Sequence, residues 1–402
     1  MLESFGKKLG ATALATTPFA LRKKLLTRKL TKATTTLESA FSEACNQVQF
    51  YRERWGTSPP PFRSIAPIPV DATAQVPWRD LLLCRSTASP TFLLEGEFGT
   101  RSAISTGDLQ NLGFYALLHP ETPDLVSALR INPAACNGVP LGATLLGPSA
   151  ERLLRFLGGS VLNLQEQPTE KAAIQLLALN PSVIAAPANS LLAWIAKARE
   201  LSPSGADRLV DGIKVFIHMG SSLPMSPAQT FQMKKAFDFT VVDWLTDGVT
   251  TALFSCQCGA FHPAPHLHLE VTDSDGAVSP LGLGALTVSD TSREVAPVLR
   301  QKTAIAVDAH SEGCPFFNQT VNLVPRGLVH EMERLDGRWV GIQDIATEVF
   351  ALGLVEKVTW SVGPKMWVVR VTPFGDKSPD REQIRSALND QFHTQIRLEI
   401  TK

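Results

Sequence analysis

The chain has 402 residues, of which 44% are hydrophobic and 19% are charged, so it is long enough for two or three folded domains. This composition excludes collagen-like and disordered classes of protein. The 38 Lys and Arg residues balance 38 Asp and Glu residues, which removes most support for nucleic acid as a partner, and no stretch approaches the roughly 18 apolar residues of a membrane span.

The N-terminal part is predicted to be helical and basic. Residues 1–55 place apolar side chains at helical spacing, and residues 56–69 contain five prolines, which predicts an extended loop. Eight Lys and Arg residues, against the single acid Glu3, lie within the first 35 positions. We expect a plain basic helix there; an organelle transit peptide and a membrane-surface helix are the alternatives.

The middle of the chain alternates between two periodicities. Helical patterns occur at 108–118, 149–157, 169–179, 189–199 and 226–237. Short β-branched runs separate them at 160–164, 182–186, 214–218 and 240–243. This alternation predicts βα units and a largely parallel sheet with helices on both faces, so the fold class is α/β.

Strands dominate after residue 256. Turn residues separate the apolar runs 266–271, 284–288, 298–307 and 320–324, which predicts a β-rich subdomain at about 256–325. From 326 to 402 the pattern reads strand, helix, two strands, helix, strand. We therefore expect a large N-terminal domain, 1–325, and a small α+β C-terminal lobe, 326–402.

The cysteines indicate a reducing compartment and a metal site. Six cysteines are too few for a disulfide scaffold and no Sec-type hydrophobic segment opens the sequence, so we expect a cytoplasmic location. Cys256, Cys258 and His262 are spaced by two and four residues, and Cys314 follows downstream. Three thiolates and an imidazole are a ligand set for structural zinc. The alternative is ordinary buried thiols beside a histidine.

A glycine-containing turn at 95–102 precedes a helix start at 105–108. The backbone amides around Gly99 and the hydroxyl of Thr100 are suited to holding phosphate oxygens. Two glutamates in the turn, Glu95 and Glu97, argue against a triphosphate. A simple turn followed by an N-cap is the alternative.

Polar residues follow two neighbouring strands of the predicted sheet. The first strand contains His218 and runs into Gly220, Ser221 and Ser222, and the second runs through Trp244 into Thr246 and Asp247. Because ligands bind at the carboxyl ends of parallel strands, both turns are expected to line one crevice. Asp247 with Gly248 is equally explained as a turn signal, and His218 as a core histidine.

Several enzyme classes lose support because their motifs are absent from the sequence. There is no Gly-x-Ser-x-Gly elbow, no zinc-protease motif, no Walker A lysine and no Rossmann fingerprint. Other short motifs are present in order: Thr106-Gly107-Asp108-Leu109, Gly220-Ser221-Ser222-Leu223-Pro224, Gly282-Leu283-Gly284 and Pro297-Val298-Leu299-Arg300. In these the chain resembles, from about residue 40 to 400, the adenylate-forming (acyl-CoA synthetase and luciferase) superfamily, in its phenylacetate-coenzyme A ligase branch.

The resemblance implies both a fold and an activity. It implies a large N-terminal domain with a mobile C-terminal lobe, and ATP- and magnesium-dependent activation of a small carboxylic acid as acyl-AMP. The acyl group would then pass to a thiol on coenzyme A or a carrier protein, in a biosynthetic role, with a homodimer as a candidate assembly. The cysteine cluster lies where some members of that branch hold zinc.

The catalytic signatures depart from the family pattern. The aromatic-Gly-x-Thr-Glu motif falls on 244–248; Thr246 and Asp247 match its Thr and Glu in one register, and Trp244 matches its aromatic residue in the other. The ribose-binding aspartate is replaced by Ile305, and the Gly-Arg pair before the hinge reads Pro325-Arg326. The late lysine of the family has no clear counterpart.

Two hypotheses follow. In the first, the chain is a divergent adenylating ligase in which Thr246 and Asp247 attend the phosphate and magnesium. Arg300 and Arg326 would stabilise charge, and an acid-binding crevice would lie near 220–222. In the second, it is a non-adenylating descendant that acts as a binding or scaffold subunit or transfers acyl groups without ATP. For that chemistry His218 is the candidate general base.

Overall fold

The computed structural model describes most of the chain after residue 36. The described residues are 37–84, 86, 88, 90, 92–96, 99–108, 122–139, 145–221, 224–250, 252–256, 258–264, 266–312, 314, 321–335, 338–362, 366–375, 379–393 and 396–400. The basic segment before residue 37 and most of the helix predicted at 108–118 lie outside these residues.

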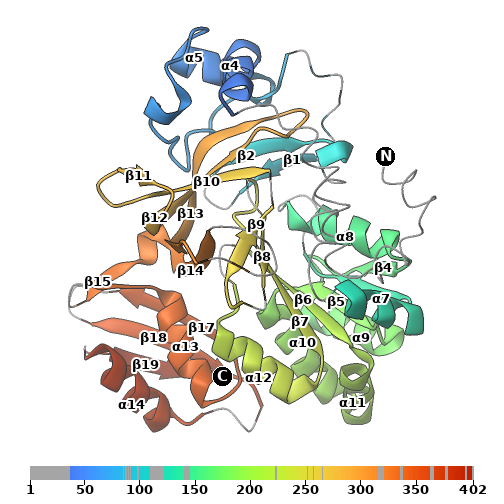
Figure 1. Ribbon diagram of the computed structural model, residues 1–402. Coiled ribbons are helices and arrows are strands. Elements are labelled where there is room, and N and C mark those ends of the chain that lie inside the picture. Colours follow the sequence, from blue (N-terminus) through green and yellow to red (C-terminus); the bar gives the residue numbers. More distant parts are fainter. Residues whose placement is uncertain are drawn as a thin grey trace.

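Half of the central sheet is parallel, and helices connect its strands (Figure 1). The strands are β3 (Ala134–Asn137), β4 (Ser160–Asn163), β5 (Val183–Ala186), β6 (Val215–Ser221) and β7 (Thr240–Thr246), in the order β4-β3-β5-β6-β7. All four residues of β5 are buried, as in strands covered on both faces. This confirms the predicted α/β class.

Helices cover both faces of this parallel half. On one face lie α7 (Thr122–Ile131) and α8 (Leu146–Phe156), which share a core with alternate residues of β5, β6 and β7. On the other lie α9 (Thr169–Leu179), α10 (Ala188–Leu201), α11 (Pro203–Gly212) and α12 (Pro227–Phe237). The two cores are separate because side chains alternate between the faces of a strand.

The other half of the sheet is antiparallel. Its strands are β8 (Ala252–Ser255), β9 (Phe261–Pro263), β10 (Leu267–Thr272), β11 (Val278–Ser279), β12 (Gly282–Asp290), β13 (Val298–His310) and β14 (Asn322–Leu328). Among the described residues, twelve strands form one sheet in the order β11-β10-β12-β13-β14-β9-β8-β7-β6-β5-β3-β4. A separate hairpin joins β1 (Phe92–Glu95) to β2 (Arg101–Ile104).

A narrow seam crosses the antiparallel half of the sheet, between β9 and β14, among the residues that the structure describes. Strand β14 pairs with β9 through the single register pair Leu323 and Phe261. By comparison, β13 and β14 share six register pairs. The main-chain connection across the seam is therefore the weakest link of the sheet.

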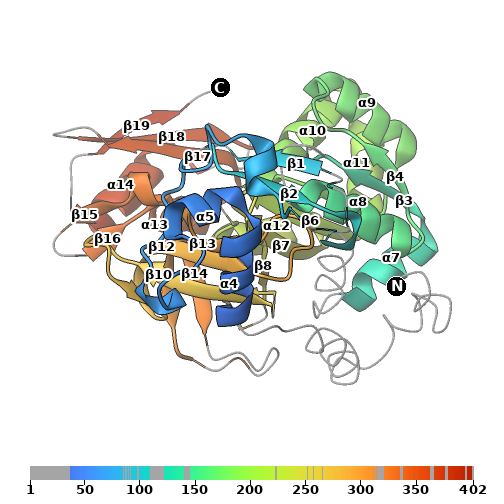
Figure 2. The ribbon, with the colours of Figure 1, turned by 90° about the horizontal axis from the view of Figure 1, so that it is seen from above.

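The N-terminal helices lie over the antiparallel half (Figure 2). They are α4 (Leu37–Gln47) and α5 (Gln49–Trp55), followed by the short 3-10 turns η2 (Phe62–Ser64) and η3 (Trp78–Leu81). Phe41 and Phe62 pack with Leu299 of β13 in one buried cluster. The Tyr51 hydroxyl donates a hydrogen bond of 2.8 Å to the Pro297 carbonyl.

Arg300 anchors the N-terminal segment to the sheet. Its guanidinium lies 2.9 Å from the Glu270 carboxylate, donates to the Phe62, Arg63 and Ile65 carbonyls, and is centred 5.5 Å from the Phe62 ring. The Arg300 side chain is only 3% exposed, and its backbone is left-handed, with φ +43°. These contacts hold the charge inside the protein with its hydrogen bonds satisfied.

The C-terminal lobe has its own core. It contains η4 (Val329–Glu331), β15 (Glu333–Leu335), β16 (Arg338–Val340), α13 (Ile342–Leu352), β17 (Val355–Val362), β18 (Trp367–Pro373), α14 (Arg381–Phe392) and β19 (Ile396–Ile400). Strands β17, β18 and β19 form a sheet that shares a buried cluster with α13 and α14. The described chain contains no helix long and apolar enough to cross a membrane.

The lobe contacts the parallel half directly. Phe374 packs edge-on against Phe237 of α12, with ring centroids 5.8 Å apart, and Gln343 donates a 2.6 Å hydrogen bond to the Pro224 carbonyl. Strand β14 runs across the boundary predicted at Arg326 and pairs with β13 as far as Leu328. The division into domains at that residue stays a prediction.

The Arg300 anchor can be tested on Glu270. We expect Glu270→Gln to lower the free energy of unfolding by about 3 kcal/mol, because it leaves the buried Arg300 charge without its counterion. Glu399→Gln is the control, since Glu399 pairs with the more exposed Arg370 and Arg397. That variant should change stability by less than about 1 kcal/mol. Urea denaturation measures both, and equal losses would contradict the anchoring role.

Candidate functional site

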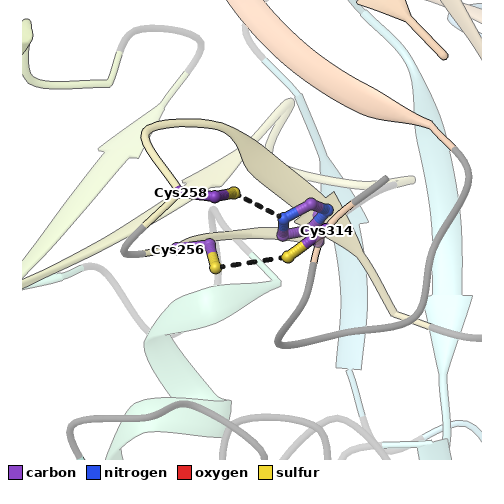
Figure 3. Close-up of side chains that lie close together, drawn as sticks. Cys256, Cys258 and Cys314 are labelled. Atoms are coloured by element: carbon purple, nitrogen blue, oxygen red, sulfur yellow. Dashed lines mark hydrogen bonds between the residues drawn. The ribbon is translucent and has the colours of Figure 1, made fainter. Parts of the chain in front are cut away.

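The four predicted metal ligands lie together (Figure 3). Cys256 and Cys258 come from the turn between β8 and β9, His262 lies in β9, and Cys314 follows β13. Their ligand atoms all lie within 4.8 Å of one another. Cys258 Sγ is 3.2 Å from His262 Nε2, and Cys256 Sγ is 3.7 Å from Cys314 Sγ. Three sulfurs and one imidazole at this spacing fit a tetrahedral metal such as zinc.

The cluster lies at the seam of the sheet. Three ligands belong to the β8–β9 side, and Cys314 belongs to the connection that leads into β14. A bound metal would therefore cross-link two segments that share one backbone pair. Burial first, and then the neighbouring thiols, raise the pKa of Cys256 in the metal-free protein. Metal binding must displace these protons, so affinity should fall as pH falls.

The second cluster of predicted residues forms at the ends of β6 and β7. Thr246 and Ser221 are register partners on these adjacent parallel strands. The Thr246 hydroxyl accepts a 2.9 Å hydrogen bond from the Gly248 backbone N–H. Asp247 accepts from the backbone N–H groups of Val249 and Thr250, at 3.1 and 2.7 Å. These hydrogen bonds close the turn that Asp247-Gly248 predicts as the alternative to a phosphate site. The role of Thr246 and Asp247 at phosphate stays a prediction.

The glycine-containing turn lies beside this cluster. A side-chain Cβ on Gly96 would lie 3.3 Å from the Asp247 carbonyl oxygen, so the two backbones approach closely. Gly99 has φ +79°, a left-handed conformation that glycine adopts readily. The Thr100 hydroxyl donates to the Val70 carbonyl at 2.6 Å. The structure thus brings the two predicted phosphate-binding turns together.

The remaining predicted cofactor-binding residues have different surroundings. Trp244 is 2% exposed and packs edge-on against Phe254, so its ring belongs to the core of the parallel half. Gly220 lies in β6 next to Leu245 of β7. Ser222 lies outside the described residues.

His218 is buried in β6 beside Asp243 of β7. Its Nδ1 accepts a 3.0 Å hydrogen bond from the Ala188 backbone N–H, which places the proton of the neutral ring on Nε2. That Nε2 lies 3.9 Å from Asp243 Oδ1. Because the accepting nitrogen is already engaged, this geometry suits the core-histidine alternative; the role as general base stays a prediction.

Asp243 is a residue whose importance the sequence did not reveal. Its Oδ2 accepts a 2.9 Å hydrogen bond from the Met225 backbone N–H. Burial holds the pKa of Asp243 well above the ordinary value of an aspartate, and the Met225 N–H opposes this only partly. The sequence does contain a signal for this residue, because an aspartate inside an otherwise apolar strand is rare unless it has a partner.

Asp243 lines a cavity of about 540 Å³ between the two lobes. We call it the interlobe cavity. Its walls come from α12, β7, the turn after Cys256, β14 and α13. Arg326 lines it and forms a 2.8 Å ion pair with Asp344. Lys234 of α12 also lines it, so a cation from β14 and a cation from α12 face the same space.

The Arg300 side chain reaches neither of the two predicted phosphate-binding turns. Its guanidinium is held between Glu270 and the carbonyls of the N-terminal segment, as described above. The predicted role in charge stabilisation stays untested, and its contacts account for a structural role.

Comparisons with known proteins give the fold. No protein-family sequence model matches the chain, and no curated protein matches it by sequence. 2-Hydroxyisobutyryl-CoA ligase in the postadenylation state, in complex with R3-HIB-AMP, superposes with TM-score 0.68 at 13% identity over 96% of this chain and 87% of that chain. The ATP-bound RpMatB-BxBclM chimera gives TM-score 0.52 at 15% identity over 79% and 65%.

At these identities the similarity establishes the fold, which is that of the adenylate-forming ligases with their smaller C-terminal region. The same 2-hydroxyisobutyryl-CoA ligase in its thioesterification state gives a TM-score of 0.51 at 12% identity, over 96% of this chain and 87% of that chain.

The metal cluster is tested by metal analysis of the purified protein. We expect about one zinc ion per chain, and Cys258→Ser should lose it because three ligands hold zinc far less tightly than four. Cys84→Ser is the matched control, because Cys84 is another exposed cysteine and lies outside the cluster. Equal zinc content in the two variants, or a metal-free wild-type protein, would contradict the assignment.

Proposed function

We propose that this chain is an adenylate-forming ligase that activates a small carboxylic acid as acyl-AMP and passes the acyl group to a thiol. The supporting observation is that its two lobes superpose on a ligase that was solved with an acyl-AMP bound, over 96% of this chain. The thiol would belong to coenzyme A or a carrier protein. Membership of the phenylacetate-coenzyme A ligase branch, a biosynthetic role, a cytoplasmic location and a homodimer are parts of the same proposal.

Substrate would bind between the strand ends and the small lobe. Thr246 and Asp247 lie beside the turn that contains Gly99 and Thr100, so phosphate oxygens and magnesium would be held there. Hydroxyl and carboxylate oxygens are suitable magnesium ligands. Arg326 faces the interlobe cavity and would stabilise negative charge that develops on the phosphate.

Zinc would have a structural role in this enzyme. We propose that it is held by Cys256, Cys258, His262 and Cys314 and fastens the seam between β9 and β14. A four-ligand site leaves no open position for substrate, which distinguishes structural from catalytic zinc.

One observation favours a second candidate, a non-adenylating protein of the same fold. Ile305, at the position of the family's ribose-binding aspartate, is 0% exposed and packs with Leu286 and Val288 in an apolar cluster. A ribose has no polar partner in that cluster. The Asp247 carboxylate and the Arg300 guanidinium are already occupied by the turn and by Glu270. Such a protein would bind partners or use pre-activated acyl donors.

Titration calorimetry with ATP and magnesium separates the two candidates. The ligase predicts micromolar binding, and Arg326→Gln should weaken it about 10- to 100-fold, because hydrogen bonds to charged groups contribute roughly 1.5–3 kcal/mol. Arg338→Gln is the control, since Arg338 is an exposed arginine of the same lobe that does not line the cavity.

Exchange of pyrophosphate into ATP with a panel of carboxylic acids then tests the chemistry. Absence of heat and of thermal stabilisation at millimolar ATP, in folded zinc-loaded protein, would reject the ligase. The His218→Ala variant would then be assayed with pre-activated acyl thioesters. Unchanged acyl transfer in that variant would reject His218 as a base.

A further inference from the structure

A second large cavity lies where the small lobe joins the antiparallel half of the sheet. Its volume is about 660 Å³. Strands β12 and β13 form one wall, and η4 with the β15–β16 hairpin forms the other (Figure 1). We call it the hinge cavity. It shares no lining residue with the interlobe cavity, and it borders one predicted phosphate-binding turn at Val70, whose carbonyl accepts the Thr100 hydroxyl.

The walls of the hinge cavity are largely apolar. The side chains that supply this character are Leu283, Ala306, Val329, Met332 and Trp339. Val329 is 40% exposed, which is unusual for an apolar residue that faces a concave surface. Cavities of roughly 300–1,000 Å³ with apolar walls and a few polar groups are typical of small-molecule sites.

One cation in the hinge cavity is available to a ligand. Lys302 of β13 lines it, and no described residue forms an ion pair with the Lys302 ammonium. The acidic residues of the cavity are Asp71 and Asp273. The Asp273 carboxylate accepts the backbone N–H groups of Asp275 and Ala277, at 2.9 and 2.8 Å, so it is committed to its own turn.

We propose that the hinge cavity binds an apolar molecule with a single carboxylate head group, which pairs with Lys302 while its body packs on Met332 and Trp339. The apolar walls select the body of the ligand by the hydrophobic effect. The unpaired ammonium selects a negative head group, and a charge-assisted hydrogen bond is the strongest available there. His330 also lines the cavity.

Such a ligand would touch both lobes. Lys302 belongs to the large domain, whereas Met332 and Trp339 follow the connection into the small lobe. Binding here would therefore favour the present orientation of the lobes over any in which the hairpin leaves the sheet. This inference goes beyond the proposed ligase activity, because the ligand would pair with Lys302 and its binding requires no ATP.

The test is calorimetry on the full-length, metal-loaded protein without ATP, with octanoate and octan-1-ol as probes. We expect octanoate to bind more tightly than the alcohol. Lys302→Gln should weaken octanoate about tenfold and leave the alcohol unchanged, since it removes one charge-assisted contact. Lys357→Gln, an exposed lysine of β17 away from the cavity, is the control and should leave both probes unchanged.

A second variant tests the location. Val329→Trp fills the opening from an exposed position, so the protein should fold and lose binding of both probes. The proposal is overturned if octanoate does not bind at millimolar concentration, if the alcohol binds as tightly as the acid, or if Lys302→Gln behaves like Lys357→Gln. Unchanged binding in folded Val329→Trp would equally overturn it.

Discussion

The narrow seam between β9 and β14 is the constraint on which the arrangement of this protein depends. In the described part of the sheet, one backbone register pair joins β14 and the antiparallel strands beyond it to β9, β8 and the parallel half with its helices. The Cys3His cluster lies at that point and takes ligands from both sides. A metal bound by this cluster would cross-link the sheet where its strand pairing is weakest.

The seam also affects both cavities, because Cys256 at the seam lines one of them and the chain continues from β14 to both. Cys256 lines the interlobe cavity, so the metal cluster also forms part of a wall that the small lobe faces. Strand β14 leaves the seam and delivers Arg326 to that cavity, and η4 follows it into the hinge cavity. Both cavities border β14 or the segment that follows it, but they differ in chemistry. Several charged side chains line the interlobe cavity, whereas the walls of the hinge cavity are more strongly apolar.

Local patterns in the sequence predicted the features that depend on neighbours in the chain. Alternating helical and β-branched runs gave the parallel sheet, because each βα unit is a local structure. The spacing of Cys256, Cys258 and His262 gave the metal cluster for the same reason. The helices α7 and α11, of ten residues each, were not predicted.

Local sequence patterns did not predict the features that depend on contacts between residues far apart in the chain. Arg300 lies in a recognisable motif, yet its partners are Glu270 and carbonyls more than 230 positions away, at separations of 238, 237 and 235 residues. Asp243 is similar, because its environment is created by α12 and the small lobe. A motif gives the residue type at a position, whereas its partners follow only from the assembled fold.

The distance between Arg300 and its carbonyl partners has a consequence for synthesis of the chain. Ile65 leaves the ribosome 235 residues before Arg300, and at about 5–20 residues per second this delay lasts roughly 10–50 s. During that time the apolar face of α4, which includes Phe41 and Ala44, has no β13 to cover it. The N-terminal helices therefore cannot dock until β13, which is made about 235 residues after Ile65, has left the ribosome.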